Sequence, residues 1–328
     1  MIEKKEVKNM DMYQKRKIRA EKKNNDSQKS FSKVPISWYP GHMKKAMDQI
    51  EQDVKLVDII IEILDARIPI SSQNPEVQKI IKNKNRIIIL NKADLSEEKE
   101  NKKWVEYFAK KGIPSILCDS NKGEGINKIT KQINEIMQEE LEKQRAKGRT
   151  SKIIRAMILG VPNVGKSSFI NRVSNKVAMQ VGNKPGVTKQ KQWIRLSNNI
   201  ELLDTPGVLW PRLEKEEIAL NLAYTGTIKS EILDEVEIAY KLLKYLLEEY
   251  RQAVVDRYSL NPEVVEKILS TDQLAENERI VEVMNYIGEK RGAVAKGNTI
   301  DLNKVSKIIL DDFRSGNLGR ITLEKVER

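Results

Sequence analysis

The nine residues GVPNVGKSS (160–168) have the types and spacing that bind a nucleotide phosphate chain. They fit G-x-x-x-x-G-K-[ST], follow the apolar run IIRAMIL (153–159) and open a helical segment, which is the context that this motif requires. Backbone N–H groups would wrap the α- and β-phosphates, Lys166 would neutralise the β/γ oxygens and Ser167 would ligate Mg²⁺. The predicted phosphate contacts are Gly160, Pro162, Asn163, Val164, Gly165, Lys166, Ser167 and Ser168.

Two later segments predict the groups that sense a γ-phosphate. In DTPG (204–207), Asp204 can hold Mg²⁺ through water and the N–H of Gly207 can meet the γ-phosphate, where any Cβ would crowd. Between this motif and the phosphate loop lies VGNKPGVTK (181–189), in which glycines flank Pro185 and precede Thr188. A mobile loop with one hydroxyl suits a switch that closes on Mg²⁺ only when the γ-phosphate is present.

Guanine recognition is predicted at NKAD (91–94), which ends the strand-like run RIIIL. Asp94 can accept from guanine N1–H and the 2-amino group together, whereas adenine would leave this carboxylate unpaired. Asn91 and the stem of Lys92 would complete the pocket. The next loop, SNKGEG (120–125), would add Ser120 and Asn121 beside guanine O6 and Lys122 against the base.

His42 in WYPGHMKKAM (38–47) is the only histidine of the chain. Pro40-Gly41 suits the centre of a type II turn, which would make His42 a cap at the start of a helix over Met43–Val54. A positive helix end disfavours imidazolium, so we expect a neutral ring that can orient a water. A catalytic group, a turn residue and an RNA contact remain open interpretations.

The elements that must position these residues alternate between strand and helix. Strand-like runs occur at 56–64, 86–90, 113–117 and 153–159, and QWIRL (192–196) and IELLD (200–204) predict a hairpin. This order predicts an α/β fold with a mainly parallel sheet and helices on both faces, including one long charged helix over about 125–147. From residue 228 the pattern predicts helices alone. We expect a flexible basic arm (1–36), a nucleotide-binding domain (37–227) and an all-α domain (228–328).

Composition limits the class of partner. The chain has 59 basic and 47 acidic residues, a net charge of +12 and a pI near 9.4. This balance favours an anionic partner, with nucleic acid as the first candidate and general solubility as the alternative. A single cysteine suits a reducing cytosol, and no run approaches 18 uncharged apolar residues. We expect a cytoplasmic protein without a membrane span or a secretory signal.

The order of the motifs carries a family resemblance. NKAD and SNKGEG precede GVPNVGKSS and DTPG, whereas ordinary GTPases have the phosphate loop first. Together with WYPGHM and DARIPISSQNP (65–75), this circularly permuted order resembles the bacterial ribosome biogenesis GTPase A family over about residues 38–328. The resemblance implies a GTPase of low intrinsic rate that is stimulated by the large ribosomal subunit. Its partners would be the 50S precursor and its rRNA, not DNA, and we expect a monomer.

Hydrolysis poses a separate problem, because Val208 follows DTPG where many signalling GTPases have a water-orienting Gln. Three substitutes are open: a K⁺ ion beside Asn163, as in potassium-dependent relatives, the ribosomal partner in trans, and His42. The predicted catalytic set is His42, Lys166, Thr188 and Gly207. An alternative is a placeholder protein that binds GTP and RNA without hydrolysis; a P-loop kinase is disfavoured by NKAD.

The chain after DTPG runs directly into the predicted helical domain, so loss of the γ-phosphate could move that domain. Basic residues near its glycine-rich turns are the candidate RNA contacts: Lys290, Arg291, Lys296, Arg314 and Arg320.

Overall fold

The computed structural model describes residues 41–148, 152–181, 193–197, 199–211, 213, 215–228, 234–295, 297 and 299–326. For Gly41, His42 and residues 174–181 it describes the backbone alone. The predicted basic arm, the predicted switch residue Thr188 and the candidate RNA contact Lys296 therefore lie outside what can be described.

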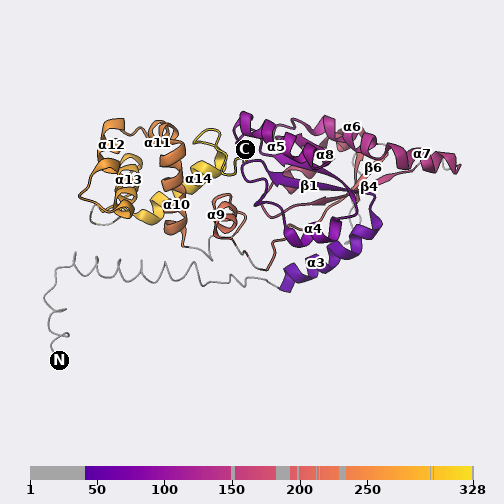
Figure 1. Ribbon diagram of the computed structural model, residues 1–328, viewed down its shortest axis with the longest axis horizontal. Helices are drawn as coiled ribbons and strands as arrows, with labels where there is room; N and C mark the ends of the chain where they lie inside the picture. The colour runs from indigo at the N-terminus through magenta and orange to yellow at the C-terminus, as the bar shows by residue number, and fades with distance from the viewer. Residues whose placement is uncertain are drawn as a thin grey trace, which may run out of the picture.

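A six-stranded sheet in the order β3-β2-β1-β4-β6-β5 forms the centre of residues 41–228 (Figure 1). All neighbouring strands are parallel except β5 and β6, which form the antiparallel hairpin that the sequence predicts. The strands are β1 (Ile59–Asp65), β2 (Asn85–Asn91), β3 (Ser115–Leu117), β4 (Ile154–Leu159), β5 (Trp193–Ser197) and β6 (Ile200–Leu203).

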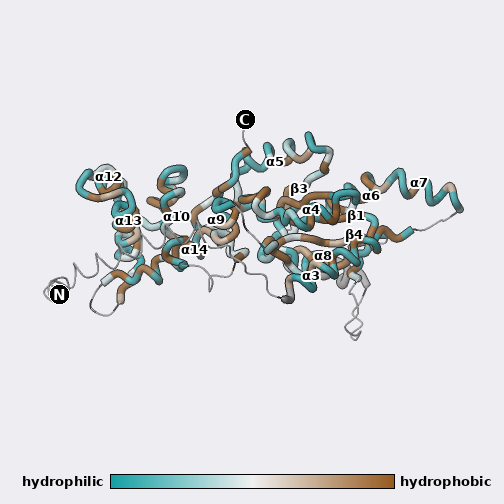
Figure 2. Tube along the Cα trace, turned by 60° about the horizontal axis from the view of Figure 1, so that its bottom comes forward, coloured by the Kyte–Doolittle hydropathy of each residue, from teal (hydrophilic) through white to brown (hydrophobic). Residues whose placement is uncertain are grey.

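Helices cover both faces of this sheet, as predicted. Alternate residues of a strand point to opposite faces. In β1 both sets are apolar except for the buried Glu62 and the terminal Asp65, as expected for a parallel strand that is buried on both sides. Ile61 faces α6 (Ile126–Ile136) and α8 (Lys166–Val181). Ile60 and Leu64 face α3 (Gly41–Asp53), the short η1 (Val54–Leu56), α4 (Pro75–Ile81) and α5 (Glu98–Lys110). Figure 2 shows the apolar strands between these helices.

The prediction of one long helix over 125–147 is wrong. The structure has α6 and then α7 (Gln138–Ala146), separated at Met137. The apolar stripe of α6 includes Ile129 and Ile133, and it ends at the buried Met137. No residue of α7 is fully buried, and of its side chains the partly buried Leu141 packs against the core. Little therefore holds α7 in line with α6, and it projects from the body (Figure 1).

The C-terminal part of the chain is helical and has its own apolar core. Its elements are α10 (Glu235–Glu249), α11 (Arg251–Tyr258), α12 (Pro262–Ser270), α13 (Glu276–Arg291) and α14 (Leu302–Ser315). Helix α9 (Glu216–Tyr224) precedes them and joins the two cores, because Leu222 belongs to the core of the sheet and Ala223 and Tyr224 belong to the helical core. Local signals set several boundaries: Asn261 caps α12 by accepting from the N–H of Glu263, and Gly292 ends α13 with φ +63°.

The segment after α14 returns to the sheet. The N–H groups of Leu323 and Glu324 donate to the carbonyl of Arg67 at 3.0 and 3.2 Å, and Ile321 N–H donates to the carbonyl of Leu95 at 2.9 Å. Residues 321–324 therefore lie against the loops that follow β1 and β2, which are more than 200 residues away in the sequence.

All the parallel strands end at the same edge of the sheet, where an open α/β sheet binds its ligand. Asp65 and Asn91, the last residues of β1 and β2, are register partners there. No helix in the described part of the chain has the length and apolarity that a bilayer crossing needs.

Candidate nucleotide-binding site

The phosphate loop joins the end of β4 to the start of α8, so that Lys166 is the first helical residue. Gly165 has φ +97°, and a Cβ there would collide with the side-chain amide of Asn91. Only glycine fits both requirements. The motif therefore lies in the strand–loop–helix context that its sequence predicts, with the helix N-terminus directed at the place for an anion.

Lys166 is buried inside this loop. Its ammonium donates to the carbonyls of Gly160 at 2.9 Å and Val161 at 3.1 Å. Burial lowers the pKa of Lys166 to about 8, and the nearby carboxylate of Asp204 opposes this shift. Burial likewise raises the pKa of Asp204, while Lys166 lowers it. Lys166 and Asp204 thus lie in one partly desolvated site. Phosphate oxygens bound there would favour the charged form of Lys166.

DTPG lies directly against the phosphate loop. A Cβ on Gly207 would stand 2.7 Å from the ammonium of Lys166 and 2.9 Å from the backbone nitrogen of Pro162. Thr205 fixes the approach by donating its hydroxyl to the carbonyl of Ile158 at 2.6 Å. The backbone of Gly207 therefore lies against the phosphate loop with no room for a side chain, and its contact with a γ-phosphate stays a prediction.

Val208 has no access to this position. Its side chain is 2% exposed and belongs to an apolar cluster that includes Ile50 and Val54. Its carbonyl accepts from the side-chain amide of Asn74 at 3.1 Å. A core residue thus stands where many signalling GTPases have the water-orienting glutamine. Another group must orient the attacking water if the protein hydrolyses GTP.

Asn91 connects the two predicted base loops to the phosphate loop. Its amide nitrogen donates to the carbonyl of Val164 at 2.7 Å, and its amide oxygen accepts from the N–H and hydroxyl of Ser120 at 3.0 and 2.8 Å. These three segments are far apart in the sequence. Asn91 therefore shapes the pocket by holding its loops together, and both ends of its amide are engaged in doing so.

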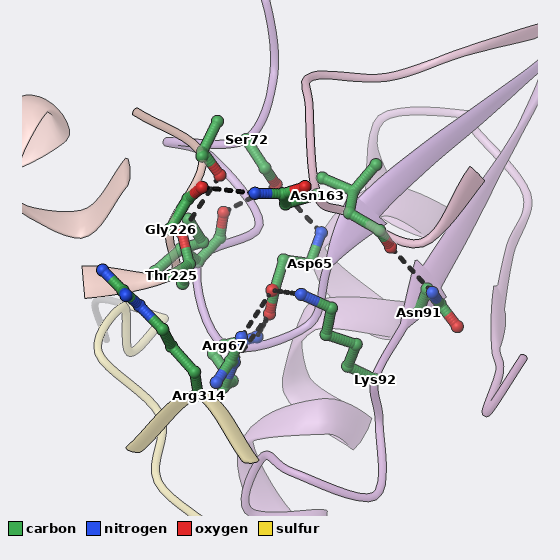
Figure 3. Close-up of polar contacts among 12 residues, drawn as sticks. Asp65, Arg67, Ser72, Asn91, Lys92, Asn163, Thr225, Gly226 and Arg314 are labelled. Carbon is green, nitrogen blue, oxygen red and sulfur yellow. Dashed lines mark hydrogen bonds and ion pairs between the residues drawn. The ribbon is translucent and has the colours of Figure 1, made fainter. Parts of the chain in front are cut away.

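Lys92 is held by a residue that the sequence analysis assigned no role. Its ammonium donates to Asp65 at 2.9 Å, and Asp65 also accepts two hydrogen bonds from the guanidinium of Arg67 at 3.0 and 2.8 Å (Figure 3). Burial alone would raise the pKa of Asp65, but Arg67 and Lys92 outweigh it and hold this pKa well below its usual range. The sequence signal that could have revealed this pairing is Asp65 itself, the first residue of DARIPISSQNP. Its role becomes visible only when the fold brings it beside Lys92 of NKAD.

Asp94 lies at the same edge and is half-buried. Burial, followed by the negative charge of Asp119, raises its pKa. Asp119 organises the next loop by accepting from the N–H groups of Asn121 and Lys122 at 2.9 and 3.1 Å. The Lys122 side chain is 67% exposed and its ammonium lies 3.7 Å from Asp119. To contact a bound guanine base as predicted, this side chain would have to turn inward.

Ser167 and Asp204 are both exposed at the mouth of the phosphate loop. No group of three or more His, Cys, Asp or Glu side chains that could hold a metal occurs in the described ranges. A hydroxyl and a carboxylate still fit Mg²⁺, which keeps several waters and takes substrate phosphates as further ligands. The third predicted magnesium ligand, Thr188, lies outside the described residues.

Asn163, the predicted K⁺ ligand, has φ +61° and donates its side-chain amide to the carbonyl of Gly226 (Figure 3). Gly226 follows α9, and Arg314 of α14 lies on its other side. Neither residue was predicted at the nucleotide site. Of His42 only the backbone is described: it stands in the first turn of α3 rather than before the helix, because α3 begins at Gly41.

This strand order, with a phosphate loop after β4 and base motifs after β2 and β3, defines a P-loop GTPase whose motifs are circularly permuted. Comparisons with known proteins agree: a family model described as 50S ribosome-binding GTPase matches residues 155–285, and one described as RsgA GTPase matches residues 77–214.

Relatives cover nearly the whole chain. Ribosome biogenesis GTPase A of Bacillus licheniformis is 41% identical over 292 residues, which cover 89% of this chain and 99% of that protein. The Bacillus cereus protein of the same name is 40% identical over 89% of this chain and 94% of its own length. The crystal structure of GNP-bound YlqF from T. maritima has a TM-score of 0.58 and 27% identity, covering 86% of this chain and 98% of that one. The chain belongs to the ribosome biogenesis GTPase A family.

Proposed function

We propose that the protein hydrolyses GTP to GDP and phosphate with Mg²⁺ and acts, as a cytoplasmic monomer, on the precursor of the large ribosomal subunit. Its GTP state would be coupled to rRNA binding, and hydrolysis would release it. The observation that carries this proposal is the hydrogen bond from Asn163 to Gly226, because it joins the phosphate loop to the turn that leads into the C-terminal helices. We assign residues 37–227 to the GTPase domain, 228–328 to a helical domain and 1–36 to a basic arm.

The roles of the site residues follow from charge and access. Lys166 would neutralise the transferred phosphoryl group, Ser167 and Asp204 would hold Mg²⁺, and the N–H of Gly207 would meet the γ-phosphate. Phosphoryl transfer has a loose transition state, so a positioned water and added positive charge matter more than a strong base. Val208 is buried and apolar, which supports a low intrinsic rate that K⁺ at Asn163 or the ribosomal partner raises.

Lys290 and Arg320 of the candidate RNA contacts are exposed, but the basic residues of the chain are concentrated in another segment. Residues 228–328 contain 16 basic and 19 acidic residues, whereas residues 143–200 contain 13 basic residues and no acidic ones. Two of the candidate RNA contacts are engaged internally: Arg291 donates to the carbonyl of Arg257, and Arg314 donates to carbonyls of α9. We propose that the exposed Arg145 and Lys147 at the end of α7 contact RNA phosphates.

The decisive measurement is GTP turnover with and without immature and mature large subunits, in KCl and in NaCl. We expect slow turnover alone, strong stimulation by large subunits and more turnover in K⁺ than in Na⁺. Absence of stimulation in every condition would favour the alternative, a placeholder that binds GTP and RNA without hydrolysis. That alternative has one observation in its support, the apolar Val208.

His42 is tested in the same assay. We propose that it orients the attacking water once the ribosome is bound, so His42→Ala should retain nucleotide affinity and lose stimulated turnover. Lys45→Ala, an exposed position on the same helix, is the matched control. Normal stimulation of the histidine variant would return His42 to a turn residue or an RNA contact.

A further inference from the structure

Arg314 closes the end of α9. Its guanidinium donates from Nε to the carbonyl of Tyr224 and from Nη2 to the carbonyl of Ala223, both at 3.0 Å. These carbonyls belong to the last turn of a helix, where intrahelical donors run out and the helix dipole is negative. A cation from α14 therefore fixes the turn that contains Gly226, and a Cβ on Gly226 would lie only 3.2 Å from the Nε of Arg314.

The fixed turn presents one carbonyl to the phosphate loop. A carbonyl can only accept a hydrogen bond, so the amide nitrogen of Asn163 must face Gly226, and its amide oxygen must face away from it. Asn163 is also held at φ +61°, a conformation that asparagine tolerates better than most residues. The backbone of the loop and the direction of its side-chain oxygen thus depend on where the carbonyl of Gly226 stands.

We infer that Arg314 is a positioning residue for the phosphate loop: by capping α9 it places the carbonyl of Gly226, which orients Asn163 toward the bound nucleotide. This inference rests on the proposed nucleotide site and deepens it, because it names how the helical domain acts on that site. Any partner that moves the last turn of α14 then changes how firmly the phosphate loop holds its ligand.

Phe313, which precedes Arg314 in α14, contacts the loop after β1 that lies beside NKAD. The guanidinium of Arg67 donates to the carbonyl of Phe313 at 3.1 Å and lies over its ring, 4.8 Å from the centroid. Arg67 shares Asp65 with Lys92 of NKAD. Consecutive residues at the end of α14 therefore reach the phosphate loop and the base loop by separate routes. Figure 3 shows Arg67 with Asp65 and Lys92, and Asn163 with Gly226.

The experiment is a double-substitution cycle on the dissociation rate of a fluorescent GDP analogue. Asn163→Gly removes the amide while keeping a residue that accepts φ +61°, and Arg314→Ala removes the cap. Arg314→Lys retains a cation that can reach one carbonyl. The control is Arg257→Ala. It breaks the 2.6 Å ion pair between Arg257 of α11 and Asp312, which lies in α14 like Arg314, and it leaves α9 untouched. Unfolding midpoints are measured for all variants.

We expect Asn163→Gly and Arg314→Ala each to speed GDP dissociation by about threefold to tenfold, the change that loss of one hydrogen bond produces. The double variant should dissociate no faster than the faster single variant, because both substitutions remove one interaction. Arg314→Lys should recover part of the loss, and Arg257→Ala should leave the dissociation rate unchanged even if it lowers the unfolding midpoint.

Two outcomes separate the inference from the function on which it rests. If the unsubstituted chain binds GDP but Arg314→Ala behaves like Arg257→Ala, or if the two effects add, the positioning role is overturned and the nucleotide site stands. If the unsubstituted chain retains no guanine nucleotide, the proposed function fails and the inference fails with it.

Discussion

The ammonium of Lys92 lies 2.9 Å from Oδ2 of Asp65, and both side chains belong to the edge of the sheet where the nucleotide site is. Asp65 is 1% exposed and is also paired with Arg67. The lysine of the guanine motif is therefore fixed by a buried carboxylate before any nucleotide arrives. Because Arg67 also donates to the carbonyl of Phe313, this carboxylate links Lys92 to the end of α14.

Asp65→Asn should be strongly destabilising. The amide keeps the shape but removes the charge that compensates two cations, and breaking a buried ion pair costs about 3 to 5 kcal/mol. We expect a lower free energy of unfolding in urea at pH 7 together with weaker GDP binding. Asp58→Asn is the control, because its ion pair with Lys152 is partly exposed and should be worth about 1 kcal/mol or less.

The same pair predicts a pH dependence. The folded pKa of Asp65 is lowered, so its stabilising contribution is complete above the unfolded pKa of about 3.9 and is lost as the pH falls toward the folded pKa. The difference in unfolding free energy between the wild type and Asp65→Asn should thus be constant at neutral pH and shrink below about pH 4. A difference that instead shrank between pH 6 and 8 would contradict the assignment to Asp65.

Lys166 predicts proton uptake when nucleotide binds. Burial lowers the pKa of Lys166 to about 8 without nucleotide, and phosphate oxygens favour the charged form, so binding must raise this pKa. Affinity for GDP should be constant below pH 8 and fall by up to about tenfold per pH unit above it. Calorimetry between pH 7 and 9, in buffers of different ionisation enthalpy, measures the proton directly.

Lys166→Arg is the control for that experiment, because its guanidinium stays charged throughout the range and leaves only the ionisation of the nucleotide itself. A wild-type affinity that follows the arginine variant up to pH 9 would mean that Lys166 is fully charged before binding.

Asp94→Asn should change which base the site prefers. The carboxylate accepts from guanine N1–H and the 2-amino group, whereas an amide can pair with xanthine, whose 2-position carries an oxygen. We expect GTP affinity to fall by at least tenfold and preference to move toward xanthosine triphosphate, measured by competition against fluorescent GDP. Unchanged GTP affinity would show that Asp94 does not read guanine.

Glu324 should be essential for the contact between the C-terminal segment and the sheet. Its two carboxylate oxygens accept from the N–H groups of Ile70 at 2.6 Å and Ser71 at 2.9 Å, and from the side-chain amide of Asn221 at 3.3 Å. Glutamine has one acceptor oxygen, so Glu324→Gln places an amide nitrogen against a donor and should lower the unfolding free energy by about 1 to 3 kcal/mol.

Its neighbour supplies the comparison. Lys325 forms a half-exposed ion pair with Glu249 at 2.6 Å, and Lys325→Ala should change stability by less than about 1 kcal/mol. Equal effects of the two substitutions in urea unfolding would contradict the importance of the buried carboxylate.

The sequence by itself determined the strands, the parallel sheet with its terminal hairpin, the phosphate loop and the permuted order of the motifs. These features depend on local spacing. The apolar runs at 86–90 and 153–159 form β2 and β4, and the phosphate-loop motif G-x-x-x-x-G-K-S is contiguous in the sequence. The break at Met137 escaped prediction because the polar residues of α7 continue the helical pattern beyond Met137, the last fully buried residue of this stretch.

Only the tertiary structure decided which partners the motif residues have. Lys92 and Asp65 are 27 residues apart, Asn163 and Gly226 are 63 apart, and Arg314 reaches Tyr224 across 90 residues. Hydrogen bonds over such separations depend on how the sheet edge and the ends of α9 and α14 meet, which no local pattern encodes. The same reason moved Arg314 from a candidate RNA contact to a helix cap beside the phosphate loop: a basic side chain looks the same in the sequence whether it faces solvent or the carbonyl end of another helix.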